Sequence, residues 1–169
     1  MDVTDLNGIN EYLTFSLAGE LYAINVGNIR EVLGVPRITR VPRMPEFMSG
    51  VVNLRGNVVP VLDLRLKFGL GSTEITEDTS IIVTEIDNFF DDDEENGFTI
   101  GIFSDNVEKV ETIEPSAIEP PPKIGIAIDT EFIVGMGKIG ESFVIILNIN
   151  KLLSGHELLG SIQEEEALS

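Results

Sequence analysis

Apolar and polar residues alternate along residues 12–17, with Leu13, Phe15 and Leu17 on one side of the pattern. A period of two is typical of a half-buried β-strand. Gly19 then offers a turn before a second apolar run at residues 21–24, which predicts that the fold opens with a β-hairpin. Further strand-like runs, rich in β-branched residues, lie at residues 38–41, 50–54, 58–62, 80–86, 98–103, 107–113, 132–136 and 143–147.

Helical signals are confined to two places. A short segment at residues 64–68 follows Asp63 and ends at Gly69, and a C-terminal segment covers residues 150–159. Many short strands separated by turns favour a sandwich or barrel over a parallel sheet that alternates with helices. Pro60 lies inside an apolar run. Because proline cannot donate to a sheet ladder, it predicts an edge position or a bulge.

The pattern of the first half returns in the second. At an offset of 78 residues the matched pairs are Ile24 and Ile102, Asn28 and Asn106, Ile29 and Val107, Val32 and Val110, Val35 and Ile113, and Pro42 and Pro120. A few residues further, at an offset of 85, they are Gly50 and Gly135, Leu54 and Ile139, Val61 and Ile146, Asp63 and Asn148, and Phe68 and Leu153. This spacing suits duplication of one small β-module, with chance similarity of aliphatic strands as the alternative. We expect one subdomain at approximately residues 12–70 plus the terminal segment, and the other at residues 80–150.

The charge narrows the classes of partner. The 169 residues carry 29 acidic and 11 basic side chains, a net charge of −18, which repels phosphates and argues against nucleic acid and anionic membranes as partners. The acidic runs at residues 91–95 and 164–166 are typical of solvated loops or tails. No apolar stretch approaches the roughly 20 residues that span a bilayer, so we expect a soluble cytosolic protein.

Few residues offer catalytic or metal chemistry. The chain has no cysteine and one histidine, His156, which we interpret as a surface or packed residue. Gly135, Gly137 and Gly140 spell GxGxxG, but a strand-like run follows where a dinucleotide site needs a helix. Residues 91–95 lack the ligand spacing of a calcium loop. We therefore expect no metal, no cofactor and no catalytic residue. A carboxylate-dependent hydrolase in an acidic β-barrel stays open as the alternative.

One motif is more specific. Residues 50–65 read GVVNLRGNVVPVLDLR. Gly56 and Asn57 are predicted to take the positive φ angles of a two-residue hairpin turn, which places the guanidinium of Arg55 at an exposed strand end. This run resembles the signature of the CheW family, which reads G-V-x-N-L-R-G-x, then two hydrophobic residues, then P-V-x-D-L. The resemblance extends over nearly the whole chain as a single CheW-like domain, with residues 91–96 as an insertion.

The resemblance implies a mainly β fold of two SH3-like five-stranded barrels with short helices, including a C-terminal one. It also implies a non-catalytic adaptor that couples methyl-accepting chemotaxis receptor tips to the regulatory domain of the CheA histidine kinase, in the cytoplasm at receptor arrays on the inner face of the membrane. An auxiliary adaptor for another receptor class is an alternative within the family. The implied partner-binding residues are Ile29, Glu31, Val32, Asn53, Arg55, Gly56, Val107 and Val110.

These residues have different expected roles. By the resemblance, Arg55 and Glu31 help couple receptor to kinase, and the four aliphatic residues line a groove between the barrels that takes a receptor helix tip. An apolar groove with a charged rim suits an amphipathic helix hairpin. Plain core packing remains open for the aliphatic residues, and an intramolecular salt bridge remains open for Arg55 and Glu31.

Overall fold

The computed structural model describes residues 10–86, 98–121 and 130–152, and within these ranges the chain is mainly β, as predicted. The strands are β1 (Glu11–Leu17), β2 (Glu20–Asn25), β3 (Ile29–Gly34), β4 (Met48–Leu54), β5 (Asn57–Leu62), β6 (Ser80–Ile86), β7 (Phe98–Ser104), β8 (Asn106–Thr112), β9 (Ile118–Glu119), β10 (Ile133–Ile139) and β11 (Ser142–Leu147). The helical segments are α2 (Leu64–Lys67) and the 3₁₀ turns η1 (Val26–Asn28), η2 (Pro115–Ala117), η3 (Thr130–Phe132) and η4 (Ile149–Lys151). The predicted C-terminal helical segment, residues 150–159, overlaps the 3₁₀ turn η4, and residues 153–159 lie outside the described residues.

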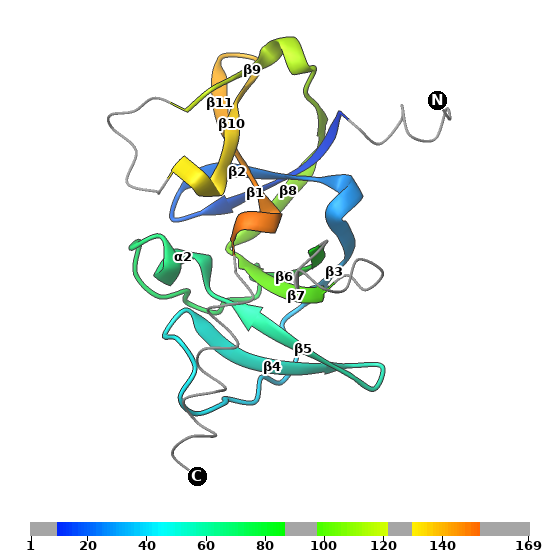
Figure 1. Ribbon diagram of the computed structural model, residues 1–169, viewed down its shortest axis with the longest axis vertical. Helices are drawn as coiled ribbons and strands as arrows, with labels where there is room; N and C mark the ends of the chain where they lie inside the picture. The colour runs from blue at the N-terminus through cyan, green and yellow to red at the C-terminus, as the bar shows by residue number, and fades with distance from the viewer. Residues whose placement is uncertain (1–9, 87–97, 122–129, 153–169) are drawn as a thin grey trace.

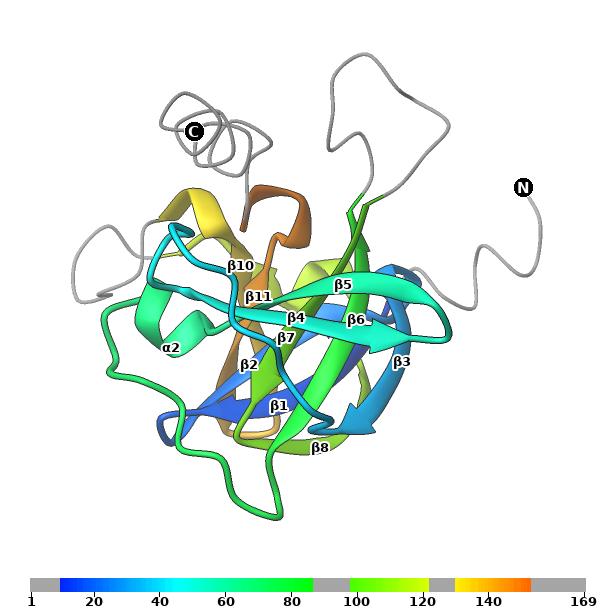
Figure 2. The same ribbon diagram turned by 90° about the horizontal axis from the view of Figure 1, so that it is seen from below.

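The strands form two sheets, which occupy the upper and lower parts of Figure 1 and cross one another in Figure 2. One has the order β8-β1-β2-β11-β10-β9 and the other β3-β6-β7-β5-β4. The two sheets correspond to the predicted pair of SH3-like units. The first has six strands, since the two-residue β9 adds to its edge.

The structure confirms the internal repeat. Strands β1 and β6 share one order of buried and half-buried positions, and so do β5 and β11. The β4–β5 and β10–β11 hairpins each contain a register shift just before a glycine, Gly50 or Gly135. After each hairpin the chain returns in the same way: Asp63 N donates to Phe47 O at 2.7 Å, and Asn148 N donates to Phe132 O at 2.8 Å. Duplication explains these matches better than chance.

The predicted subdomain boundaries are wrong, because the halves exchange strands. The β1–β2 hairpin of the first half pairs with β8 and β11 of the second, while β3 and β5 pair with β6 and β7. Each sheet therefore contains strands from both sides of residues 70–80. Equivalent strands of a repeat present equivalent faces, so the alternation pattern identifies the strands without specifying their partners.

Three hydrophobic clusters follow from this exchange. Smaller ones lie in each sheet, around Val61 and Ile81 in one and around Ile113 and Ile146 in the other. The largest, the central cluster, joins side chains of both sheets, including Phe15 and Ile102. Each large apolar side chain that is fully buried stabilises the fold by roughly 1.5–3 kcal/mol. Since the largest cluster lies between the sheets, the two sheets form one cooperative body.

Pro60 lies in β5, a strand that is paired along only part of its length on one side. Strand β5 lies inside its sheet, between β7 and β4, so the predicted edge strand is wrong at the level of the sheet. However, β5 pairs with β7 only at Val61 and Leu62. The part of β5 before Val61 is not paired with β7, so a residue without an N–H is tolerated there.

Candidate partner-binding surface

The tip of the β4–β5 hairpin displays Arg55. Leu54 pairs with Asn57, so the turn residues are Arg55 and Gly56, with φ angles of 51° and 88°. The predicted turn, Gly56 and Asn57, is wrong by one residue. Two positive φ angles match the right-handed twist of the strands, although this left-handed conformation is unfavourable for an arginine. Asn53 supports the turn, because its Oδ1 accepts from Gly56 N at 2.9 Å.

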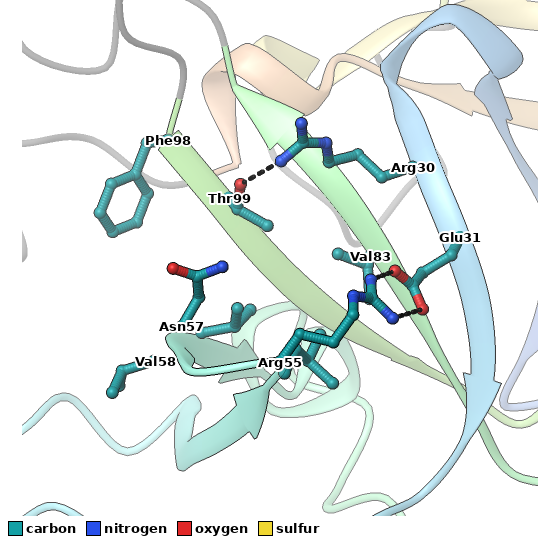
Figure 3. A pocket seen from close by; sticks show the side chains of 10 residues that line it. Arg30, Glu31, Arg55, Asn57, Val58, Val83, Phe98 and Thr99 are labelled. Carbon is teal, nitrogen blue, oxygen red and sulfur yellow. Dashed lines mark hydrogen bonds and ion pairs between the residues drawn. The ribbon is translucent and has the colours of Figure 1, made fainter.

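Glu31 on β3 holds the guanidinium of Arg55. Both terminal nitrogens of Arg55 donate to the carboxylate oxygens of Glu31, one of them at 3.4 Å, as the dashed lines in Figure 3 show. The hydrogen bond that Arg55 donates to Glu31 raises the pKa of Arg55 further above its ordinary value. The side chain of Arg55 is 74% exposed, so this pair adds little stability. The ion pair does, however, fix the direction in which the guanidinium of Arg55 points.

Beside this pair lies a hollow of about 370 Å³, which we call the first hollow. Its lining residues are Arg30, Glu31, Leu54, Arg55, Asn57, Val58, Val59, Val83, Phe98 and Thr99. Arg30 donates to Thr99 Oγ1 at 3.4 Å and its Nε lies 3.5 Å from a carboxylate oxygen of Glu85. Sequence reasoning did not select Arg30, because strand alternation predicts that it faces away from Glu31.

A second hollow, of about 210 Å³, lies in the other sheet. It is lined by Thr14, Leu21, Glu108, Lys109, Glu111, Ile139 and Ser142. Lys109 Nζ lies 2.9 Å from Glu111 Oε1. The hydrogen bond that Lys109 donates to Glu111, together with the negative charge of Glu111, raises the pKa of Lys109. Both hollows thus contain an ion pair: in the first it joins β3 to the β4–β5 turn, and in the second both partners lie on β8.

The four predicted aliphatic residues divide into two equivalent pairs. Ile29 and Val107 are half-buried against the central cluster. Val32 and Val110 are exposed by 41% and 52%. None of the four lines either of these two hollows. For Ile29 and Val107 the structure therefore shows core packing, while Val32 and Val110 offer apolar surface on β3 and β8.

The other candidates from the sequence are a metal site, His156 and the glycines of the GxGxxG run. Within residues 10–86, 98–121 and 130–152, no group of three or more histidine, cysteine, aspartate or glutamate side chains is placed to hold a metal ion. His156 and residues 91–95 lie outside these ranges. Gly135 and Gly137 lie in β10, and Gly140, with a φ of 61°, lies in the turn before β11. In the described part of the chain, no helix is long and apolar enough to cross a membrane.

Comparison with known proteins agrees with the motif. A family model described as the CheW-like domain matches residues 11–157, which include every described strand. The chain belongs to the CheW-like family. It is 36% identical over 148 residues to a chemotaxis protein CheW of Klebsiella aerogenes, covering 88% of this chain and 84% of that protein. A chemotaxis protein CheW of Helicobacter pylori is 32% identical over 149 residues, with the same shares covered.

A solved CheW structure shares the fold. The crystal structure of the scaffolding protein TtCheW from Thermoanaerobacter tengcongensis matches with a TM-score of 0.76 and 36% identity, covering 89% of this chain and 92% of that one. The CheW-like match includes both hollows and the whole β4–β5 hairpin.

Proposed function

We propose that this chain is a non-catalytic adaptor of bacterial chemotaxis signalling, which couples the cytoplasmic tips of methyl-accepting chemotaxis receptors to the regulatory domain of the CheA histidine kinase. The observation that carries the proposal is Arg55: an exposed guanidinium in a two-residue turn, oriented by Glu31 at the mouth of a hollow. The names of the relatives, chemotaxis proteins and a scaffolding protein, support the same class of function.

An adaptor needs at least two faces, and the repeat supplies them. Each sheet exposes one valine on its edge strand, Val32 or Val110, and one apolar residue early in the returning strand of its hairpin, Val58 or Phe143. These pairs match at the offsets of the repeat, and each accompanies an ion pair. Apolar anchors beside charged groups are typical of protein interfaces.

In this proposal the predicted binding residues act in three groups. Arg55, Glu31 and Val32 contact a partner, as does Val110 on the other sheet, while Asn53 and Gly56 form the turn that presents Arg55. Ile29 and Val107 fix the edge strands to the central cluster. Such a protein acts by stabilising one arrangement of its partners, and its effect is limited by its differential affinity for the two arrangements.

Catalysis is not part of the proposal. The carboxylate of Glu31 in the first hollow and that of Glu111 in the second are bound to Arg55 and Lys109, and no specific observation favours a hydrolase. The proposed site of action is the cytoplasmic face of the membrane, at receptor arrays, with the receptors supplying the membrane attachment.

The direct test is a binding measurement with two purified probes, a receptor cytoplasmic tip fragment and the kinase regulatory domain. We expect the chain to bind both, and Arg55→Ala to weaken at least one of them by about tenfold or more, because central arginines are frequent interface hot spots. Arg37→Ala, at another exposed arginine, is the matched control and should bind normally. Failure of the wild-type chain to bind either probe contradicts the proposal.

A further inference from the structure

Arg30 and Glu31 are consecutive residues of β3, yet both line the first hollow. In a regular strand they would point to opposite faces of the sheet. The β3–β6 pairing shifts register between Ile29 and Glu31, so Arg30 is the extra residue of a bulge. Bulges re-aim side chains, and this one directs a second guanidinium towards the hollow that Arg55 borders (Figure 3).

The second hollow contains the same device with the opposite charge. The β8–β1 pairing shifts register between Leu13 and Phe15, and the consecutive residues Glu108 and Lys109 both line the second hollow. At the offset of 78 residues that matches Val32 with Val110, Arg30 matches Glu108 and Glu31 matches Lys109. Both charges of the bulge are therefore reversed between the halves.

The linings consequently differ in net charge. The first hollow has two guanidiniums, Arg30 and Arg55, against the one carboxylate of Glu31. The second has the ammonium of Lys109 against the carboxylates of Glu108 and Glu111. The lining side chains of the first hollow sum to one positive charge and those of the second to one negative charge; with Glu85, which pairs with Arg30 from outside the lining, the first site is neutral. In a chain with a net charge of −18, a carboxylate of a partner is therefore repelled less at the first hollow than at the second.

Arg30 is positioned to receive such a group. Its Nε faces Glu85 and one terminal nitrogen donates to Thr99; among the described residues its other terminal nitrogen has no hydrogen-bond partner. The guanidinium fork suits a carboxylate, with which it forms charge-assisted hydrogen bonds. Asn57 adds an amide to the lining, and Val58, exposed by 69%, offers an adjacent apolar contact.

We propose that the first hollow binds an acidic side chain of a partner protein and that Arg30 selects it, whereas the equivalent second hollow rejects that side chain. The proposal deepens the proposed function, on which it rests, by assigning the partner's chemistry to one of the two faces. Interface charges of this kind determine which partner docks, and in which orientation, more than they determine overall affinity.

The test exchanges the charges of the two bulges. Arg30→Glu gives the first hollow the residue of the second, and Glu108→Arg does the reverse. Affinities for the receptor tip fragment and for the kinase regulatory domain are measured separately, at low and at high ionic strength. We expect Arg30→Glu to weaken one probe by about tenfold or more and to flatten its salt dependence. Glu108→Arg should leave the affinity for that probe unchanged.

Two further variants keep the test decisive. Arg30→Gln removes the charge alone, and we expect it to weaken binding by a smaller factor, about fivefold. This variant carries the test if a thermal unfolding control shows that Arg30→Glu does not fold. Glu85→Gln removes the intramolecular partner of Arg30 and should not weaken binding. Replacing an acidic residue of the affected probe with arginine should restore its affinity for Arg30→Glu.

The outcomes separate the two proposals. If the wild-type chain binds but Arg30→Glu binds both probes as well as wild type, the assignment of Arg30 is wrong and the adaptor function stands. Equal losses for Arg30→Glu and Glu108→Arg with the same probe also overturn the assignment, because neither hollow then selects. If the wild-type chain binds neither probe, the proposed function itself fails.

Discussion

The β4–β5 and β10–β11 hairpins are two versions of one structure. Both shift register just before a glycine, both place the returning strand in the same sequence of exposed and buried positions, and both end in a two-residue turn. The turns differ, with Arg55 and Gly56 in one and Gly140 and Glu141 in the other. Positions facing the core therefore remained alike after duplication, while tip residues, which face solvent or partners, diverged.

The prediction with the greatest expected loss of stability concerns the glycine that follows the register shift in each hairpin. In Gly50→Ala the new Cβ would lie 2.4 Å from the carbonyl oxygen of Thr39, and the φ of 151° is unfavourable for alanine. We expect a loss of about 3 kcal/mol in the free energy of unfolding, measured by urea denaturation. Gly135→Ala meets Glu119 O at 2.7 Å without a positive φ, so its loss should be smaller.

Gly34→Ala is the control for both variants, because a Cβ at Gly34 meets nothing within 4 Å. Its free energy of unfolding should stay within about 0.5 kcal/mol of wild type. A Gly50→Ala variant as stable as Gly34→Ala would contradict the inference that the close approach of the Thr39 backbone requires glycine at position 50.

The next prediction compares the two residues that follow the hairpins, Asp63 in the first half and Asn148 in the second. The buried carboxylate of Asp63 accepts from Arg65 N at 3.1 Å, and from the N–H and hydroxyl of Thr73 at 2.8 and 2.7 Å. The side chain of Asn148 makes no capping hydrogen bond. We expect Asp63→Ala to lower the free energy of unfolding by about 2 kcal/mol and Asn148→Ala by about 0.5 kcal/mol or less. Equal losses would show that the two caps are equivalent.

A smaller effect concerns the divergent tip. Arg55→Gly gives the first turn the residue that the second turn has at the equivalent position. It also removes the cost of holding an arginine in the left-handed backbone conformation. We expect a Tm at or above that of wild type and above that of Arg55→Ala, together with weaker partner binding. Thermal unfolding measures the first and the binding assay measures the second. A Tm below that of Arg55→Ala would show that Arg55 stabilises the turn.

The smallest effect tests the ion pair of the second hollow. The pKa of Lys109 is raised above 10.5 mainly by its hydrogen bond with Glu111, and least by the charge of Glu108. A raised pKa means that this pair stabilises the fold below pH 10.5 and that the contribution is lost as pH rises through the folded-state pKa. Glu111→Gln should lower the pKa of Lys109, measured by NMR titration, more than Glu108→Gln does. The opposite order would contradict the pairing.

Much of the fold followed from residue patterns. The matches of Gly50 with Gly135, and of Asp63 with Asn148, were visible before any coordinates, because close backbone approach and chain reversal restrict the residue type. The motif around Arg55 also indicated an exposed hairpin tip, although the turn begins one residue earlier than predicted. Turn registers depend on which residues pair across the hairpin, and alternation alone tolerates a slip at the tip.

The mainly β class, the duplicated module and the relation to a family of adaptors all follow from the order of residues along the chain, because burial periodicity and special backbone positions are local properties. The exchange of strands between the halves, the packing of Ile29 and Val107 against the central cluster, and the hollow that Arg30 shares with Arg55 could be seen only in the three-dimensional fold. Strand partners and bulges result from pairing between distant segments, and the two copies of a repeat compete equally for the same partners until packing selects one.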